Sequence, residues 1–148
     1  MGFSYLENMA TADVAFKAWG NSLEELFTSC ADALLAITVS HPENIGPAEE
    51  RAIELKSDSL DLLLHNFLQE IIYFKDADQL LLKVRDISIE SVDNPDSSSL
   101  WILKATLAGE SLSLHGDDLL ADVKAVTFHD FVLEKKDGRW EATVILDV

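Results

Sequence analysis

Cysteine is almost absent from the sequence, and so are long apolar runs. The single cysteine, Cys30, rules out an intramolecular disulfide and leaves no cysteine-rich metal motif. No apolar stretch reaches the ~18 residues that a membrane-spanning helix needs. The N-terminus also lacks a basic patch followed by a long apolar run, so we expect no signal peptide. By default, these absences predict a reducing, cytoplasmic location.

Basic residues are scarce. The chain has 11 Lys and Arg against 27 Asp and Glu, a formal net charge of −16, and a pI near 4.3. Such a surface repels the phosphate backbone, so we expect no direct binding of nucleic acid. It suits a protein that meets a basic partner or a cation, although solubility alone explains the charge equally well.

The sequence does contain enough apolar residues to form a hydrophobic core. Hydrophobic residues make up 48% of the 148, which excludes a disordered chain and predicts a single domain over residues 1–148. The apolar periodicity indicates an α+β fold, a largely antiparallel β-sheet with two main α-helices packed on it. The expected strands cover residues 2–7, 13–19, 51–56, 79–85, 86–92, 100–108, 123–128, 131–135 and 140–146. Residues 79–92 kink in the middle, 93–99 form a polar turn, and 111–115 form a strand or a bend.

Two helices are expected early in the chain. Ser22 and Glu25 have the spacing of a capping box, and apolar residues at three- and four-residue steps continue that helix to about residue 39. Cys30 falls on its apolar face and is expected in the core. A second helix carries a broad apolar stripe from Leu60 to Ile72. Between the last two strands, Asp137-Gly138 predicts a tight hairpin.

The usual catalytic signatures are missing. The sequence contains no glycine-rich phosphate loop, no Gly-x-Ser-x-Gly elbow and no His-Glu-x-x-His helix. The histidines share no metal-ligand spacing; they are His41, His65, His115 and His129. His65 lies beside core leucines, where we interpret it as a boundary residue.

The remaining candidate metal ligands are carboxylate oxygens. Asp13 opens the strand expected at 13–19, and Asp147 with Val148 closes the chain. If these two strands are neighbours, two side-chain carboxylates and the terminal carboxylate converge, a set that suits calcium or magnesium rather than zinc. The alternative is coincidence, because a chain with 27 acidic residues always has some close together.

Several motifs, taken in order and with their spacing, resemble the archease family almost end to end. They are Thr11-Ala12-Asp13-Val14, Ser22-Leu23-Glu24-Glu25-Leu26-Phe27, Asp61-Leu62-Leu63, Gln69-Glu70-Ile71-Ile72-Tyr73, Gly109-Glu110, Val123-Lys124-Ala125-Val126-Thr127-Phe128-His129, Asp137-Gly138-Arg139-Trp140 and Val144-Ile145-Leu146-Asp147-Val148. Two positions depart from the family pattern. Met9-Ala10 stands where the family has Glu-His, which bears on metal affinity, and Phe128 stands where it has Tyr.

The resemblance implies an accessory protein rather than an enzyme. Archeases promote guanylylation of the RtcB-type RNA ligase that joins tRNA halves, so that the ligase turns over repeatedly. The resemblance further implies a divalent metal, commonly calcium with magnesium or manganese possible, bound by Asp13, Asp147 and Val148. Lys124 is implied in activation of the ligase, and we expect His129 to contact the partner. Our hypothesis is that the cation organises the docking edge, while Lys124 pairs with a phosphate or a ligase carboxylate.

Two other classes stay open. A general chaperone of several protein partners would be favoured if the apolar stripe of the second helix were partly exposed. A metal-dependent hydrolase could use the same carboxylates, but the sequence offers it no base, nucleophile or phosphate cradle.

Overall fold

The computed structural model describes residues 1–6, 13–93 and 99–148. Met9-Ala10, where the sequence departs from the family pattern, and residues 94–98 of the polar turn lie outside the described residues. In chain order the elements are β1 (Gly2–Leu6), β2 (Asp13–Gly20), α1 (Leu23–Thr38), η1 (Pro42–Asn44), β3 (Glu49–Ser57), α2 (Leu60–Asp78), β4 (Leu80–Val92), β5 (Leu100–Ser111), η2 (Leu112–Asp118), β6 (Ala125–Lys136) and β7 (Arg139–Asp147).

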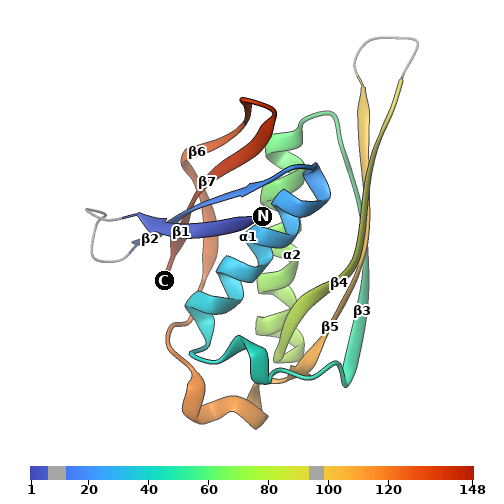
Figure 1. Ribbon diagram of the computed structural model, residues 1–148. Coiled ribbons are helices and arrows are strands. Elements are labelled where there is room, and N and C mark those ends of the chain that lie inside the picture. The colour runs from blue at the N-terminus through green and yellow to red at the C-terminus, as the bar shows by residue number, and fades with distance from the viewer. Residues whose placement is uncertain (7–12, 94–98) are drawn as a thin grey trace.

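Two antiparallel sheets enclose the two α-helices (Figure 1). One sheet has the strand order β1-β2-β7-β6 and the other β3-β5-β4. A single cluster of buried side chains includes residues of both helices and both sheets, so the helices form the middle layer. The predicted α+β class, with two main helices on antiparallel strands, is confirmed. The division into two sheets was not predicted, because alternation shows that a strand has an apolar face but not which sheet it joins.

Helix α1 begins where the sequence predicts a helix N-terminus. Ser22 Oγ accepts a hydrogen bond from the N–H of Glu25 at 3.1 Å. The Glu25 carboxylate accepts one from the N–H of Asn21 at 3.4 Å, so the returning bond forms one residue earlier than a capping box requires. Cys30 is fully buried at 0% exposure, and this burial raises the pKa of its thiol. The predicted core cysteine is therefore confirmed.

Helix α2 buries its apolar stripe between the two sheets (Figure 1). Leu63, Leu64, Phe67 and Leu68 are all 0% exposed. An exposed apolar stripe would have favoured a general chaperone, but these residues of the stripe are buried. Among the described residues, no helix is long and apolar enough to cross a membrane.

Three local features test the expected strand boundaries. The kink expected in 79–92 is confirmed as a register shift between Val84 and Asp86 within β4. The hairpin expected at Asp137-Gly138 is confirmed, since both residues have positive φ, 52° and 77°. A strand at 111–115 is wrong, because β5 ends at Ser111 and residues 112–118 form the 3-10 segment η2.

Candidate functional site

The structure places Asp13 directly opposite Asp147. The two residues are partners at the end of the antiparallel β2–β7 ladder, and Ala125 of β6 pairs with Asp147 on its other side. Directly opposite residues project to the same face with Cβ atoms roughly 4.5–5.5 Å apart. The two acidic side chains, 134 positions apart in the sequence, therefore share one end of one sheet face, and both are half-buried.

Two acidic residues directly opposite each other destabilise a strand pair unless positive charge lies between them. Neither carboxylate has an ion-pair partner among the described residues. Nothing else in the fold requires acids there, since residues such as Thr or Val suit this ladder position better. A bound cation would offset the like charges of this pair.

Lys124 and Val148 lie at the same place. The backbone N–H of Lys124 donates to the C=O of Asp147 at 2.8 Å, so the lysine enters β6 beside the last residues of β7. Its side chain is exposed, and Val148 is half-buried against the core. We call the group Asp13, Lys124, Asp147 and Val148 the carboxylate corner. Figure 1 shows the C-terminal end beside the start of β2.

The N-terminal amine is elsewhere. Gly2 pairs with Trp19 at the far end of β2, and the Met1 ammonium lies 3.9 Å from the Glu25 carboxylate. The convergence that the sequence suggested thus involves the strand that begins at Asp13, not the first residues of the chain.

His129 is not part of the carboxylate corner. It lies four residues beyond Ala125 on β6, it is 78% exposed, and its Nε2 is 3.3 Å from the Asp130 carboxylate. The structure therefore separates two of the predicted partner contacts, Lys124 at the corner and His129 further along the same strand.

Two residues of α2 that the sequence did not single out as site residues hold β6 in place. The Nε2 of His65 lies 3.0 Å from the C=O of Val126, and the side-chain oxygen of Gln69 accepts from the N–H of Val126 at 2.6 Å. Because β6 is an edge strand, these outward backbone groups have no strand partner. The signal in the sequence was the four-residue spacing of two polar side chains on one helix face, beside the apolar stripe.

The donor set at the corner fits a hard cation incompletely. Among the described residues, no group of three or more His, Cys, Asp or Glu side chains gathers in one place. Asp13 and Asp147 supply carboxylate oxygens, and Val148 supplies a main-chain oxygen. Oxygen donors suit calcium or magnesium, but calcium takes six to eight oxygens. A partner or water must supply the others.

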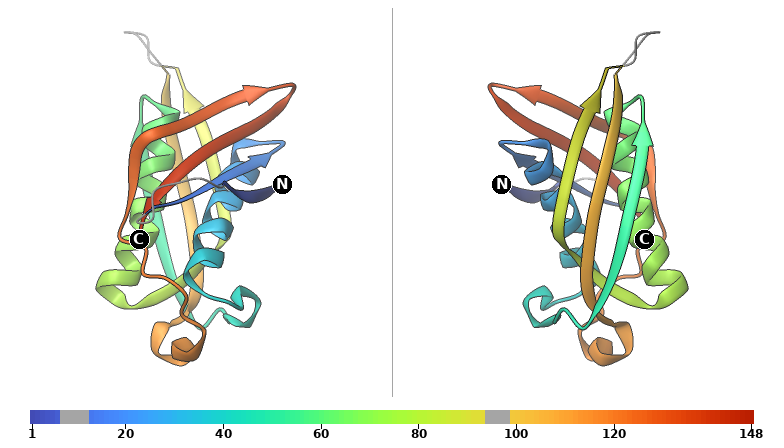
Figure 2. Two further views of the ribbon diagram at one scale, coloured as in Figure 1. Left: turned by 90° about the vertical axis from the view of Figure 1, so that its left-hand side faces the viewer. Right: turned by 90° about the vertical axis from the view of Figure 1, so that its right-hand side faces the viewer.

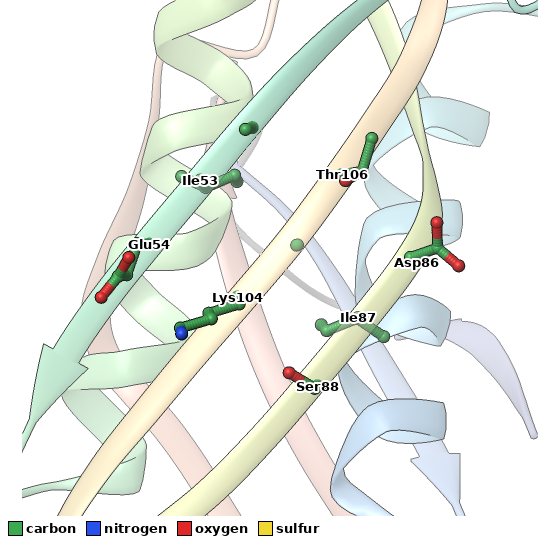
Figure 3. Close-up of a pocket in the computed structure, with 9 residues that line it drawn as sticks. Ile53, Glu54, Asp86, Ile87, Ser88, Lys104 and Thr106 are labelled. Atoms are coloured by element: carbon green, nitrogen blue, oxygen red, sulfur yellow. The ribbon is translucent and has the colours of Figure 1, made fainter.

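A hollow lies on the other sheet. It covers about 540 Å³ on the outer face of β3, β4 and β5, between Glu54, Lys104 and Asp86 (Figure 3). Small side chains such as Ala52 and Thr106 form its floor, and the described residues that line it include no histidine or cysteine. It is a shallow depression in a strand surface, without the pairing of nucleophile and base that a hydrolase would need.

Fold and site together define a class: a small, acidic α+β protein with two helices between two antiparallel sheets and a pair of carboxylates where β2 and β7 meet. Residues 3–148 match the model of the Archease protein family, and the chain belongs to that family. Protein archease of Pyrococcus abyssi is 34% identical over 139 residues, which are 93% of this chain and 94% of the relative.

Solved structures agree with this assignment. The solution structure of Methanobacterium thermoautotrophicum protein 1598 matches with a TM-score of 0.79 and 31% identity, over 99% of each chain. The crystal structure of a Thermotoga maritima protein, described as an archease and possible chaperone, matches with a TM-score of 0.60 over 97% of this chain and 96% of its own. At 18% identity the second match concerns the fold alone.

Proposed function

We propose that this protein activates an RNA ligase of the RtcB type by promoting guanylylation of the ligase, so that each ligase molecule acts repeatedly. The protein itself is proposed to have no catalytic activity. The observation that carries the proposal is the carboxylate corner in a member of the archease family, where Asp13 and Asp147 face each other beside an exposed Lys124. Cytoplasmic location belongs to the proposal, because a buried, unpaired thiol such as Cys30 suits a reducing compartment.

The charge of the protein supports an enzyme as the partner rather than RNA. A net charge of −16 repels phosphate groups but attracts the basic surface that an RNA-binding enzyme needs. The net charge therefore favours docking on a basic face of the ligase over direct binding of RNA.

Asp13, Asp147 and a main-chain oxygen of Val148 would hold a divalent cation, proposed to be calcium, with magnesium or manganese as alternatives. Such a cation supplies positive charge and open coordination positions at the corner. Lys124 would place its ammonium next to the same corner, where it can pair with a phosphate or a carboxylate of the ligase. His129 is proposed as a second contact to the partner.

Asp13→Ala tests the corner. In a ligation assay with substoichiometric ligase, wild-type protein should raise the reaction to many turnovers per ligase, and D13A should leave it near the unstimulated level. The variant removes one like charge from the β2–β7 pair, so its fold should be kept. Calcium titration should show weaker binding by D13A than by wild type.

Asp117→Ala is the matched control, because Asp117 is an exposed acid on η2, away from the corner. It should stimulate the ligase as wild type does. Stimulation by D13A at the wild-type rate would remove the corner from the proposal, and a wild-type protein that never stimulates the ligase would end the proposal itself.

A general chaperone is the second candidate, because the Thermotoga maritima relative is described as a possible chaperone. The same assay separates the two functions. Stimulation confined to the RNA ligase supports an activator, whereas rescue of unrelated, aggregating enzymes at equal concentration supports a chaperone.

A further inference from the structure

The strand β6 is interrupted beside the carboxylate corner. Thr127 pairs with Ile145 and Val132 pairs with Thr143, so five steps along β6 match two along β7. Three extra residues are therefore accommodated in residues 128–131, which we call the β6 bulge. A bulge bends its strand, and β6 turns sharply along its course in Figure 2. Asp130 within it has a φ of +52°, a left-handed conformation that is uncommon for a residue other than glycine.

Such a conformation persists only where the surroundings determine it, and it is found often at functional sites. Here the surroundings are aromatic. The ring of Phe128 stacks on His65 of α2 with centroids 3.9 Å apart and planes 11° apart. Phe131 meets both rings edge-on, at 5.7 Å from Phe128 and 6.0 Å from His65. His65 is itself fixed through its contact with the C=O of Val126.

The result is a rigid but exposed aromatic ring. Phe128 is 52% exposed, although its inner face is fully engaged by His65. Because half of the ring stays in water, it contributes less to stability than full burial of a ring of this size would. Val132, at the end of the bulge, is a second exposed apolar residue at 43%.

Exposed polar residues lie next to Phe128 in the chain and on α2. His129 and Asp130 are exposed on the bulge itself. Asp61 is exposed one turn before His65 on the same side of α2. An orientated aromatic residue with polar neighbours that water can reach is typical of the energetic centres of protein interfaces.

We propose that Phe128 is the apolar anchor by which this protein docks on its partner, inserting its outer face into an apolar pocket on a basic protein surface. This inference rests on the proposed function, with the RNA ligase as that partner. It adds a second contact region, along β6 from the carboxylate corner. An exposed aromatic ring can also stack on an RNA base. The net charge of −16 favours a basic protein over RNA.

The test measures the Kd for the purified ligase, without RNA, for three variants: Phe128→Ala, Phe128→Tyr and Leu114→Ala. F128A should bind roughly 10- to 100-fold more weakly than wild type, as loss of a central aromatic anchor does. F128Y keeps the ring and should bind within a few-fold of wild type. Leu114 is 67% exposed on η2, away from the bulge, and L114A should bind as wild type does.

Thermal unfolding checks that the variants are folded. If F128A does not fold, hydroxyl-radical labelling of the wild-type protein decides: Phe128 should be protected when the ligase is added, and equal labelling with and without ligase overturns the inference. Wild-type affinity of a folded F128A also overturns it, as does a loss of RNA binding with unchanged affinity for the ligase. If the inference about Phe128 is overturned in one of these ways while the wild-type protein still stimulates the ligase, the proposed function stands. A wild-type protein that neither binds nor stimulates the ligase contradicts both the inference and the proposed function.

Discussion

Single residues at the corner and at the bulge have roles that depend on contacts across long stretches of chain. Asp13 and Asp147 are each ordinary acids in the sequence, and only the β2–β7 pairing makes them a pair. Glu110 is a third example. Its carboxylate accepts from the backbone N–H of Gly46 at 2.7 Å and lies 3.0 Å from Nε2 of His115, so it joins the end of β5 to two loops.

The pH dependence of stability should report on Glu110. The backbone N–H of Gly46, and to a lesser degree the His115 side chain, hold the pKa of the Glu110 carboxyl below its usual value. Because the pKa is lower in the folded protein, Glu110 contributes stability above the unfolded-state pKa of about 4.3, and this is lost as the pH falls through the folded-state value. Urea unfolding should therefore show wild type more stable than Glu110→Gln at pH 6, with the difference shrinking as the pH falls below the unfolded-state pKa.

Glu43→Gln, at an exposed position on η1, is the control for a general effect of removing one acid from this chain. A gap between wild type and E110Q that stays constant from pH 6 to pH 3 would show that the Gly46 and His115 contacts do not depend on the charge of Glu110.

Residue patterns predicted part of the candidate site. The acidic residues Asp13 and Asp147 could be chosen because each lies at the boundary of a predicted strand. The two α2 contacts to Val126 could not, since they join residues 57 and 61 positions apart, and no local spacing predicts which helix side chain meets which strand edge. The bulge was equally hidden, because two short strands at 123–128 and 131–135 look the same whether they are separate or one bent strand.

In this fold, side chains of the helices bond to backbone groups of the edge strands. The N–H of Ile89 on β4 donates to the Glu24 carboxylate of α1 at 3.1 Å, as the backbone of Val126 on β6 bonds to α2. Both β4 and β6 are edge strands of their sheets. An edge with unpaired backbone groups pairs readily with other chains, so these side-chain contacts also limit aggregation.

Gln69→Leu tests the contact at β6. The substitution keeps the size of the side chain but leaves the N–H of Val126 without its acceptor, and Val126 is buried at 5% exposure. An unpaired buried donor costs about 1–3 kcal/mol, so the free energy of unfolding should fall by that amount. Hydrogen exchange at the Val126 amide should accelerate as well.

Asn66→Leu is the matched control for that experiment, because Asn66 is exposed on the same helix. It should change the free energy of unfolding by no more than about 0.5 kcal/mol. If Q69L were as stable as N66L, the Gln69 contact would not be what secures the edge of β6.

The N-terminal ends of the helices follow from short-range sequence rules. Ser22 and Ser59 cap α1 and α2 through the backbone N–H groups of Glu25 and Leu62, as short-range side-chain rules require. Residues 111–115 were expected as a strand or a bend, and the strand is wrong because the chain turns there, in η2, on its way from β5 towards β6. Tertiary demands of this kind override a five-residue pattern.

The whole molecule combines a sheet–helix–sheet core with a strongly acidic surface. The helices and the inner faces of both sheets share the large buried apolar side chains of the core. The two proposed contact regions lie in one sheet, the corner at the ends of β2 and β7 and the bulge on the neighbouring edge strand β6. A basic partner can thus be attracted by the whole surface and then fixed at this edge.

The rate of association with the ligase should therefore depend strongly on salt. Long-range attraction between oppositely charged proteins accelerates encounter, and it is screened beyond about 10 Å at 0.1 M salt and about 3 Å at 1 M. Stopped-flow measurement should show the association rate constant falling by roughly tenfold or more between 0.05 and 0.5 M NaCl, while dissociation, governed by close contacts such as the proposed Phe128 anchor, changes little. F128A should show the same salt dependence of association with faster dissociation. An association rate that salt leaves unchanged would mean that the net charge of −16 serves solubility alone.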